Sequence, residues 1–600
     1  MNIEQLILIF SVLTIYSSFI KKIYKVKFST PGKLNLGDVL SLFIITVISI
    51  ILNNHFYYGA LIIILTILWI DSLIMFCFGM KISLDNVKVF TQGVSTFKGE
   101  FKAVINLITR FHWMLAAYLF LISSLIYLDS GVNYFLIASI ILLVFCLTKS
   151  KIKNIKSFLA WIVISILLMT LGKYVEESNV IYHALLIIFS LLSLDIIKFK
   201  RFLSLKSVFY GFLLGSSIKK GISTENNKHI LDEILQSRMK ESSTNKSEHF
   251  GKAKDFNVLL FTIESMSDEA FSDSPVARKI TDSFTNRSEV QRFYSVSPNT
   301  NQSIMQLYTN EYGVNGTYNT LHELKKHGYD SLFISTQETK HFEMKTKLVD
   351  AGFDSIIDGE DLIDCTSSND YRLLDNIDVI SEKLKRGKAF IHVLNSQTHS
   401  RYSVENKDKF NRYKNTDDRG RYLNAVDEAL DIVHTMLNKL KDDDVLKNTI
   451  VILTGDHGQS FGEEGYFTHS SATINQQVQI PLCIFNNDLP MTKADSANLL
   501  DLLPTVFDLL GVELDLNNKD GINFTNQERN YLLLYSETRG YNSPSNISVL
   551  RKGKKYYMDL LKYETRILDI DDGEISDYDL SKDEIRQIVF LAAEKHNILD

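Results

Sequence analysis

The chain has 600 residues, and its 64 Lys and Arg residues nearly balance its 70 Asp and Glu residues, giving a formal net charge of −6. This length allows several domains. The balance of charge argues against nucleic acid as the main partner, because domains that bind nucleic acid carry a basic surface. The four cysteines show no spacing typical of a zinc site. The sequence leaves open whether Cys365 and Cys483 form a disulfide bond.

The first third of the chain is dominated by Ile, Leu, Phe and Val. A transmembrane helix needs roughly 20 mostly apolar residues. Stretches that reach or approach this length are 3–20, 38–52, 56–80, 112–128, 134–147, 158–171 and 180–197. The sequence therefore predicts a polytopic α-helical membrane domain over residues 1–218. Lysines follow the first stretch without a small-residue cleavage site, so we expect a retained span and not a removed signal peptide.

Positive charges in the short loops predict the orientation of these spans. Lysines and arginines concentrate in alternate loops, which places those loops in the cytoplasm and the N-terminus outside. Counted in this way, the chain beyond residue 201 lies in the cytoplasm unless one more segment crosses the membrane. The candidate for that crossing is 207–218, which is short for a span and equally compatible with a re-entrant or interfacial helix.

From residue 219 onward the composition is that of a globular protein. Residues 219–254 are polar and rich in Ser, Asn, Lys and Glu, as in a linker. We expect a catalytic domain over 255–515 and a smaller C-terminal subdomain over 516–600. Apolar runs predict buried strands at 257–263, 331–335, 389–394 and 449–453. The clearest helical periodicity covers 419–440. Strands alternating with helices predict a parallel α/β sheet.

Side chains capable of catalysis follow the predicted strands. Glu264 follows the first strand, His399 comes shortly after the third, and Asp456 and His457 come after the last. Thr300 follows a short apolar pair, in a segment expected to begin a helix. Because the carboxyl ends of parallel strands converge on one edge of a doubly wound sheet, we expect these residues to meet.

The predicted metal ligands are Glu264, Thr300, Asp456 and His457. Two carboxylates, an imidazole and a hydroxyl suit a divalent cation, with Zn²⁺ expected first and Mn²⁺ as the alternative. A metal ion lowers the pKa of a coordinated hydroxyl, so Thr300 is also the predicted nucleophile. Taken alone, Thr300 has the character of a helix N-cap. The two roles are compatible, because a helix N-terminus also stabilises phosphate.

Residues 456–469 follow the pattern D-H-G-x-S-x-G-E-x-G-x-x-x-H. This pattern resembles the metal loop of the alkaline phosphatase/sulfatase superfamily, and more closely that of bacterial membrane phosphoethanolamine transferases. N-V-L-L-F-T-I-E-S and N-T-N-Q-S-I-M-Q-L-Y resemble the metal-binding Glu strand and the nucleophile segment of phosphoethanolamine and lipoteichoic acid transferases. The resemblance implies a sulfatase-like α/β domain outside the cytoplasmic membrane. It also implies that His399 and His469 bind phosphate or a second metal ion.

Two later segments extend the resemblance to sulfatase-type domains. Residues 499–512 are similar to a helix near the end of such domains, and 547–557 to their small C-terminal sheet. The main class of sulfatases, however, needs a C/S-x-P-x-R motif, and around Thr300 no Arg stands at the required spacing. A sulfate-ester activity is therefore not favoured. Glu463 is expected to orient its loop, and His341 and His392 are expected to be structural.

The residues and the resemblance together predict an enzyme. It would be a phosphotransferase that moves phosphoethanolamine or phosphoglycerol from a membrane phospholipid donor to a surface glycan or lipid acceptor through phospho-Thr300. The first alternative is a hydrolase of the sulfatase family, either a phosphodiesterase or a sulfuric ester hydrolase. The second is a non-catalytic lipid sensor, against which the intact set of predicted ligands argues.

Overall fold

A computed structural model describes residues 246–600, apart from 285–288, 314–315, 319, 340–343, 363–368, 401, 414–416, 467, 487–492, 517–518, 537–543, 545, 560–563, 577–579, 597 and 599–600. The predicted membrane domain and most of the predicted linker lie outside these residues. Among the helices of the described part, none has the length and apolar character needed to span a bilayer.

The central sheet has the strand order β4-β3-β5-β1-β6-β8. Its strands are β1 (Asn257–Ile263), β3 (Asp330–Ser335), β4 (Ser355–Ile357), β5 (Ala389–Leu394), β6 (Thr449–Gly455) and β8 (Leu482–Phe485). The pairs are parallel, except that the edge strand β8 runs antiparallel to β6. All four strands predicted from apolar runs are present, and two of them have the predicted bounds.

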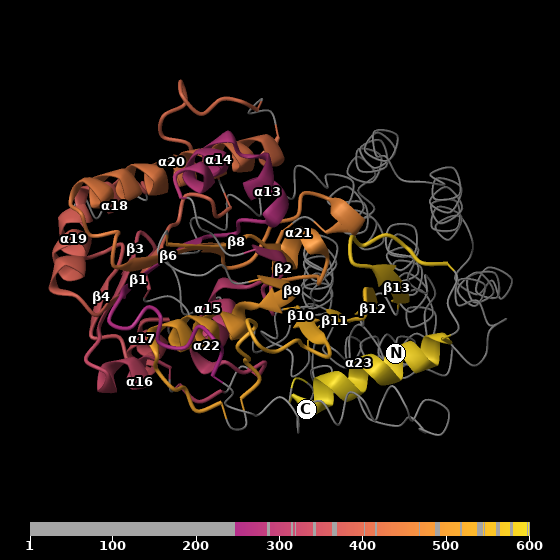
Figure 1. The fold of residues 1–600 in the computed structure, drawn as a ribbon. Coiled ribbons are helices and arrows are strands. Elements are labelled where there is room, and N and C mark those ends of the chain that lie inside the picture. The colour runs from indigo at the N-terminus through magenta and orange to yellow at the C-terminus, as the bar shows by residue number, and fades with distance from the viewer. Residues whose placement is uncertain are drawn as a thin grey trace, which may run out of the picture. The chain divides into compact units, whose positions relative to one another are not determined.

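Helices cover both faces of this sheet, and the sheet lies between them (Figure 1). One face carries α13 (Asp268–Asp273), α14 (Pro275–Asp282), α18 (Arg372–Asp375), α19 (Ile377–Arg386) and α20 (Asp418–Asp442). The other carries α15 (Thr300–Thr309), α16 (Thr320–Lys326), α17 (Met344–Ala351) and α22 (Leu499–Leu510). The arrangement confirms the predicted α/β architecture, and α20 extends the predicted helix by one residue at its start and two at its end.

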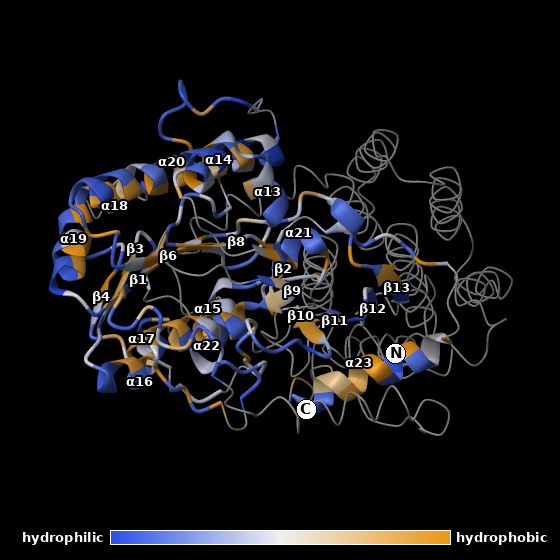
Figure 2. Cartoon of the chain, in the orientation of Figure 1, coloured by the Kyte–Doolittle hydropathy of each residue, from blue (hydrophilic) through white to orange (hydrophobic). Residues whose placement is uncertain are grey.

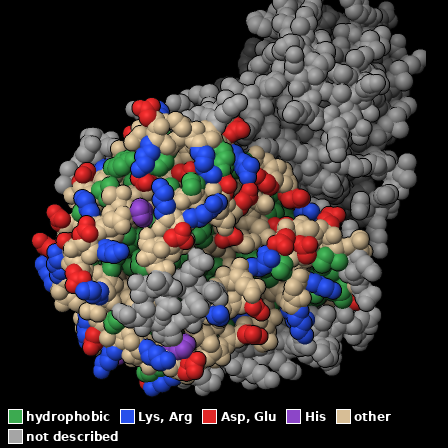
Figure 3. All heavy atoms as spheres, turned by 45° about the horizontal axis from the view of Figure 1, so that its top comes forward, with side chains coloured by type: hydrophobic (Ala, Val, Ile, Leu, Met, Phe, Trp, Pro, Cys, Tyr) green, Lys and Arg blue, Asp and Glu red, His purple; other side chains and the backbone are tan. Residues whose placement is uncertain are grey.

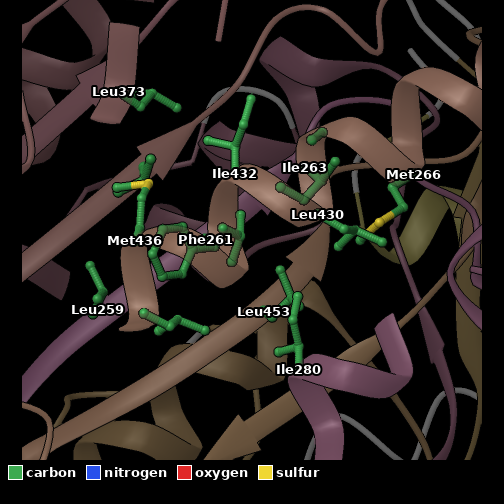
Figure 4. Close-up of a cluster of buried hydrophobic side chains, with 14 of the residues drawn as sticks. Leu259, Phe261, Ile263, Met266, Ile280, Leu373, Leu430, Ile432, Met436 and Leu453 are labelled. Carbon is green, nitrogen blue, oxygen red and sulfur yellow. The ribbon is translucent and has the colours of Figure 1, made fainter. Parts of the chain in front are cut away.

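The side chains on the two faces of β1 belong to two separate hydrophobic cores. Leu259, Phe261 and Ile263 pack with α14 and α20 (Figure 4), whereas Val258 and Leu260 pack on the opposite side. This alternation follows from the period of two in a strand. Burying each large side chain contributes roughly 1.5–3 kcal/mol, so both faces of the strand anchor the residue that follows it, Glu264.

The covering helices carry hydrophilic residues alongside hydrophobic ones (Figure 2), as expected for helices with one buried side. On the face drawn in Figure 3, acidic and basic side chains are interspersed over the described surface.

Two smaller sheets complete the described chain. A three-stranded sheet has the order β7-β2-β9, with β7 (Gln479–Ile480), β2 (Glu289–Tyr294) and β9 (Lys493–Asn498). The strand before Thr300 therefore belongs to this sheet and not to the central one, which differs from our expectation. The C-terminal sheet has the order β10-β11-β12-β13, with β10 (Leu532–Tyr535), β11 (Asn546–Arg551), β12 (Lys554–Asp559) and β13 (Glu564–Asp569). Helix α23 (Lys582–Lys595) packs against β11 and β12.

The last residues of the predicted linker are folded onto the domain. The amides of Gly251 and Ala253 donate to the carbonyls of Asp508 and Leu509, both at 2.8 Å, and the amide of Ser247 donates to the Asp508 carboxylate at 3.0 Å. The described chain from residue 246 thus caps the end of α22, so folded structure begins before residue 255.

Candidate metal centre

Glu264, Asp456 and His457 form a buried cluster in which one ligand atom from each lies within 4.8 Å of the others. The register of the central sheet explains this meeting, because Ile263 at the end of β1 pairs with Gly455 at the end of β6. Glu264 and Asp456, the residues that follow these two strands, therefore lie side by side. A Cβ atom on Gly455 would lie 2.3 Å from the carbonyl oxygen of Met266, so this close approach requires glycine.

Neutral hydrogen-bond donors hold the Glu264 carboxylate. Its Oε1 accepts from the Ser265 hydroxyl at 2.9 Å, and its Oε2 accepts from Nε2 of Gln337 at 2.7 Å. Its backbone amide donates to Oδ1 of Asn395 at 2.7 Å. Burial would raise the pKa of Glu264, but the nearby histidines and these hydrogen bonds outweigh it and hold the pKa below its usual value. Glu264 is therefore ionised.

Asp456 has one satisfied oxygen and one unsatisfied oxygen. Oδ1 accepts from the amides of Ser265 and His457, both at 2.8 Å. Oδ2 is buried and has no hydrogen-bond partner among the described residues. Burial, reinforced by the charge of Glu264, raises the pKa of Asp456 well above its usual value. A buried carboxylate oxygen without a donor is costly, and a cation at this place would satisfy it.

His457 presents the nitrogen that a metal ion needs. Its Nδ1 lies 2.9 Å from the carbonyl oxygen of Gly458 and must donate to it, because a carbonyl only accepts. Nε2 therefore carries the lone pair and lies 3.4 Å from Oδ2 of Asp456 and 3.5 Å from Oε1 of Glu264. Burial lowers the pKa of His457, which favours the neutral ring. A fixed tautomer with an unprotonated Nε2 is typical of metal-binding histidines, so the cluster fits a divalent cation.

Thr300 closes the cluster from a different part of the fold. Its Oγ1 lies 3.1 Å from each carboxylate oxygen of Glu264 and 3.1 Å from Nε2 of His457. It is the first residue of α15, and the N-cap is Asn299, whose side chain accepts from the amide of Gln302. The predicted capping role of Thr300 is therefore wrong. Thr300 is half-buried, whereas Glu264, Asp456 and His457 are fully buried, so Thr300 lies on the open side of the cluster.

His399 and His469 lie beside this open side. The ring centroid of His469 is 4.6 Å from that of His457 and 5.3 Å from that of His399. Nδ1 of His469 lies 2.8 Å from Oε1 of Gln459, which fixes the orientation of the ring. His399 is exposed and His469 is half-buried. The structure thus brings all six predicted site residues to one place, and their chemical roles remain predictions.

Sequence reasoning missed the residues that orient the ligands. Gln337 and Asn395 come shortly after β3 and β5, and Ser265 comes two residues after β1. Like Glu264, these polar residues come shortly after strands. Amides and hydroxyls are common in loops, however, so nothing in the sequence distinguished them as partners of a metal ligand.

The residues assigned other roles lie as follows. Oε2 of Glu463 accepts from the amide of Phe461 at 2.5 Å, in keeping with its expected loop-orienting role. His392 is buried between Thr262 and Tyr308. Cys483 is buried in β8, whereas His341 and Cys365 lie outside the described residues.

Comparison with known proteins agrees with this fold. Residues 256–512 match the family model named Sulfatase. An uncharacterized protein of Haemophilus influenzae is 23% identical over 321 residues, which are 50% of this chain and 48% of that protein. The low-salt glycan biosynthesis sulfotransferase Agl7 of Haloferax volcanii is 26% identical over 146 residues, which are 22% of this chain and 36% of that protein. The match thus spans less than half of the length of each of these two relatives.

Among solved structures, the lipoteichoic acid synthase LtaP of Listeria monocytogenes superposes with a TM-score of 0.48 at 17% identity, covering 62% of this chain and 98% of that chain. The family match and the buried cluster lie in the same segment. The chain therefore contains a sulfatase-family domain, of the alkaline phosphatase superfamily, over residues 256–512.

Proposed function

We propose that the chain is a metal-dependent phosphotransferase that moves a phosphoethanolamine or phosphoglycerol group from a membrane phospholipid to a surface glycan or lipid. The observation that carries the proposal is the position of Thr300 Oγ1, 3.1 Å from Glu264 and 3.1 Å from His457. A hydroxyl at its ordinary pKa is a weak nucleophile. This hydroxyl lies beside the carboxylate of Glu264 and the unprotonated nitrogen of His457. The same cluster contains the unsatisfied oxygen of Asp456.

The residues that would hold the metal ion are Glu264, Asp456, His457 and Thr300. When bound, Zn²⁺ or Mn²⁺ would lower the pKa of the Thr300 hydroxyl and offset the two buried carboxylates. The chain itself supplies the orientation. Gln337 fixes the Glu264 carboxylate, and the carbonyl of Gly458 fixes the His457 tautomer.

The reaction then proceeds in two displacements at phosphorus, in which Thr300 is first the nucleophile and then the leaving group. Its oxygen attacks the phosphorus of the phospholipid, the bond from phosphorus to the diacylglycerol oxygen breaks, and diacylglycerol leaves with a proton. The head group remains on Thr300 as a phosphodiester. A hydroxyl or phosphate of the acceptor attacks the same phosphorus and regenerates Thr300.

His399 and His469 lie on the side from which the phospholipid would approach. Their ring nitrogens are suited to bind the non-bridging oxygens and to exchange the proton with the leaving and entering groups. Gln459 is bonded to His469, and Gln337 donates to Glu264. In this scheme residues 1–218 anchor the domain in the membrane, and the domain faces away from the cytoplasm.

The test is the mass of the peptide that contains Thr300, after incubation of the full chain with phospholipid vesicles. An added phosphoethanolamine or phosphoglycerol group would support the proposal and identify the donor. Hydrolysis is the competing outcome, and the match to the Sulfatase model favours it as the second candidate. Head-group release to water, with no adduct on Thr300 at any time of quenching, would replace the transferase proposal with a hydrolase.

A further inference from the structure

The metal loop, residues 456–469, begins at the central sheet, but its tip is held by the C-terminal sheet. Tyr466 in this loop is 1% exposed. Its hydroxyl donates to the carboxylate of Asp559 and lies 3.0 Å from the hydroxyl of Tyr557. Both partners belong to β12. Burial, reinforced by Asp559, raises the pKa of Tyr466 well above its usual value, so the hydroxyl remains a donor.

The chain that leaves the metal loop is bonded to the neighbouring strand. The amide of Thr473 donates to Oδ1 of Asn546 at 3.0 Å, and its hydroxyl donates to the same oxygen at 2.5 Å. The hydroxyl also lies 2.5 Å from that of Ser548. Asn546 and Ser548 lie on β11, and all three residues are fully buried.

The short helix α21 (Asn475–Val478) is fixed by the turn that follows β13. The amide of Asn475 donates to Asp572 at 2.6 Å, and its side chain donates to the carbonyl of Ile570 at 2.7 Å. The buried ammonium of Lys555 joins the two, 2.6 Å from Asp572 and 3.1 Å from Asn475. The same charged contact thus ties this helix to β12.

Helix α21 in turn holds the part of the loop nearest the cluster. The amide of Gly458, next to His457, donates to the carbonyl of Gln477 at 2.8 Å. The Gln477 side chain donates to the hydroxyl of Ser460 at 2.9 Å and accepts from the amide of Ala472 at 3.0 Å. Gln477 therefore connects the beginning of the metal loop with the segment that follows its end.

We propose that the C-terminal sheet, which lies beyond the 256–512 family match, positions the metal loop, and that Tyr466 is the positioning residue for His469. The ligands Glu264, Asp456 and His457 stand directly at strand ends and have their own anchors. His469 lies three residues from Tyr466 and far from either strand end. Its ring lies 2.8 Å from Gln459, and the amide of Ser470, the next residue, donates to the carbonyl of Pro298 at 2.7 Å. Tyr466 adds the anchor on the other side of His469, at the tip of the loop. The effect on substrate binding rests on the proposed function, whereas the effect on loop order does not.

The test is amide hydrogen exchange of the full chain with Tyr466→Phe, which removes the hydroxyl and keeps the ring. A hydrogen bond to a charged group is lost, so exchange across 459–474 should accelerate by about tenfold or more. Exchange in β1 and β6 should not change. The matched control is Tyr531→Phe, which removes a buried hydroxyl bonded to His596 and not to the metal loop. It should leave exchange across 459–474 unchanged.

A second readout concerns the site. Tyr466→Phe should retain its metal ion, and KM for donor vesicles should rise several-fold with a smaller change in kcat. Asp559→Asn keeps an acceptor oxygen for Tyr466 and should accelerate loop exchange less than Tyr466→Phe does. Unchanged loop exchange in Tyr466→Phe would overturn the proposal, and so would an equal acceleration in β1 and β6. Because hydrogen exchange needs no donor lipid, either result is independent of the transferase chemistry.

Discussion

Ile263 at the end of β1 lies directly opposite Gly455 at the end of β6. This register places Glu264 and Asp456 next to each other although 191 residues separate the Ser265 amide from the Asp456 carboxylate to which it donates. Since a slip of one residue turns every side chain of a strand to the other face, the cluster depends on this pairing. The apolar faces of β1, buried in two cores, hold the register.

The first prediction is that the chain binds about one divalent metal ion tightly. Glu264 and Asp456 supply both carboxylates, so the Glu264→Ala, Asp456→Ala double variant should lose the ion. The measurement is the metal content of the purified full chain after dialysis. Glu463→Gln is the matched control, because that carboxylate bonds to the amide of Phe461, and it should keep the ion. Equal metal content in the wild type and the double variant would show that the cluster is not the site.

The second prediction concerns Gln337, which donates to Glu264 and to the carbonyl of Asn395. Partners of this kind orient metal ligands, and their loss weakens metal binding by about 10- to 100-fold. Gln337→Leu should show this loss in a competition titration against a chelator. Gln479→Leu removes an amide that donates to Asp268 and should bind metal like the wild type. Unchanged affinity in Gln337→Leu would assign the amide a packing role only.

The sequence predicted the strands and the residues after them because both signals are local. Apolar residues dominate 257–263, 389–394 and 449–453. Glu264 follows the first run directly, and Asp456 follows the last after two residues. The sheet to which β2 belongs was not predictable, because β2 pairs with β7 and β9, about two hundred residues later in the chain. The position of Gln337 had no local signal either, since its partner Glu264 is 73 residues away.

The sequence analysis assigned the N-cap of α15 to the wrong residue. Asn299 and Thr300 are both of residue types that cap helices, and they are neighbours at the start of α15. The backbone decides between them, since Asn299 is extended, with φ of −145°, and its side chain accepts from Gln302. The docking of Tyr466 on β12 had no signal of its own, because a tyrosine in a loop is equally compatible with the surface.

The third prediction is a pH dependence that arises from His392. Burial lowers the pKa of His392 to about 3, from an ordinary value of 6.5. Below pH 6.5 the unfolded chain binds a proton there that the folded chain does not, so this residue makes stability fall as the pH falls from 6.5 toward 3. The contribution is at most about 1.4 kcal/mol per pH unit.

His392→Gln keeps polar contacts with Thr262 and Tyr308 but does not titrate. The measurement is the urea concentration at the midpoint of unfolding of the domain, read by proteolysis of the full chain in detergent with excess chelator. As the pH is lowered, this midpoint should fall less steeply in the variant than in the wild type. The exposed His327→Gln is the control and should follow the wild type. If the midpoint falls equally steeply with pH in the wild type and in His392→Gln, His392 is not the source of this pH dependence.

The fourth prediction is that the catalytic domain lies outside the cytoplasm. The charge count through residue 201 leaves the side open, and the resemblance to envelope enzymes favours the outside. A cysteine introduced at Ser243 should react with a membrane-impermeant reagent on intact cells, with the parent chain as the control for native cysteines. Labelling that requires lysis would place the domain inside and exclude transfer to a surface acceptor.

The last prediction separates the two candidate reactions at Thr300. Thr300→Ala removes the oxygen that lies 3.1 Å from Glu264 and His457. Because Asn299 is the cap, this change should leave the stability nearly unchanged, whereas Asn299→Ala should cost about 1 kcal/mol. Glu264, Asp456 and His457 remain, so Thr300→Ala should still bind metal. Its turnover of donor lipid should fall by orders of magnitude and no adduct should form, while Thr300→Ser keeps a hydroxyl and should keep part of the activity. If Thr300→Ala consumes donor lipid at the wild-type rate, water is the nucleophile, and the chain is a hydrolase whose Thr300 only lines the site.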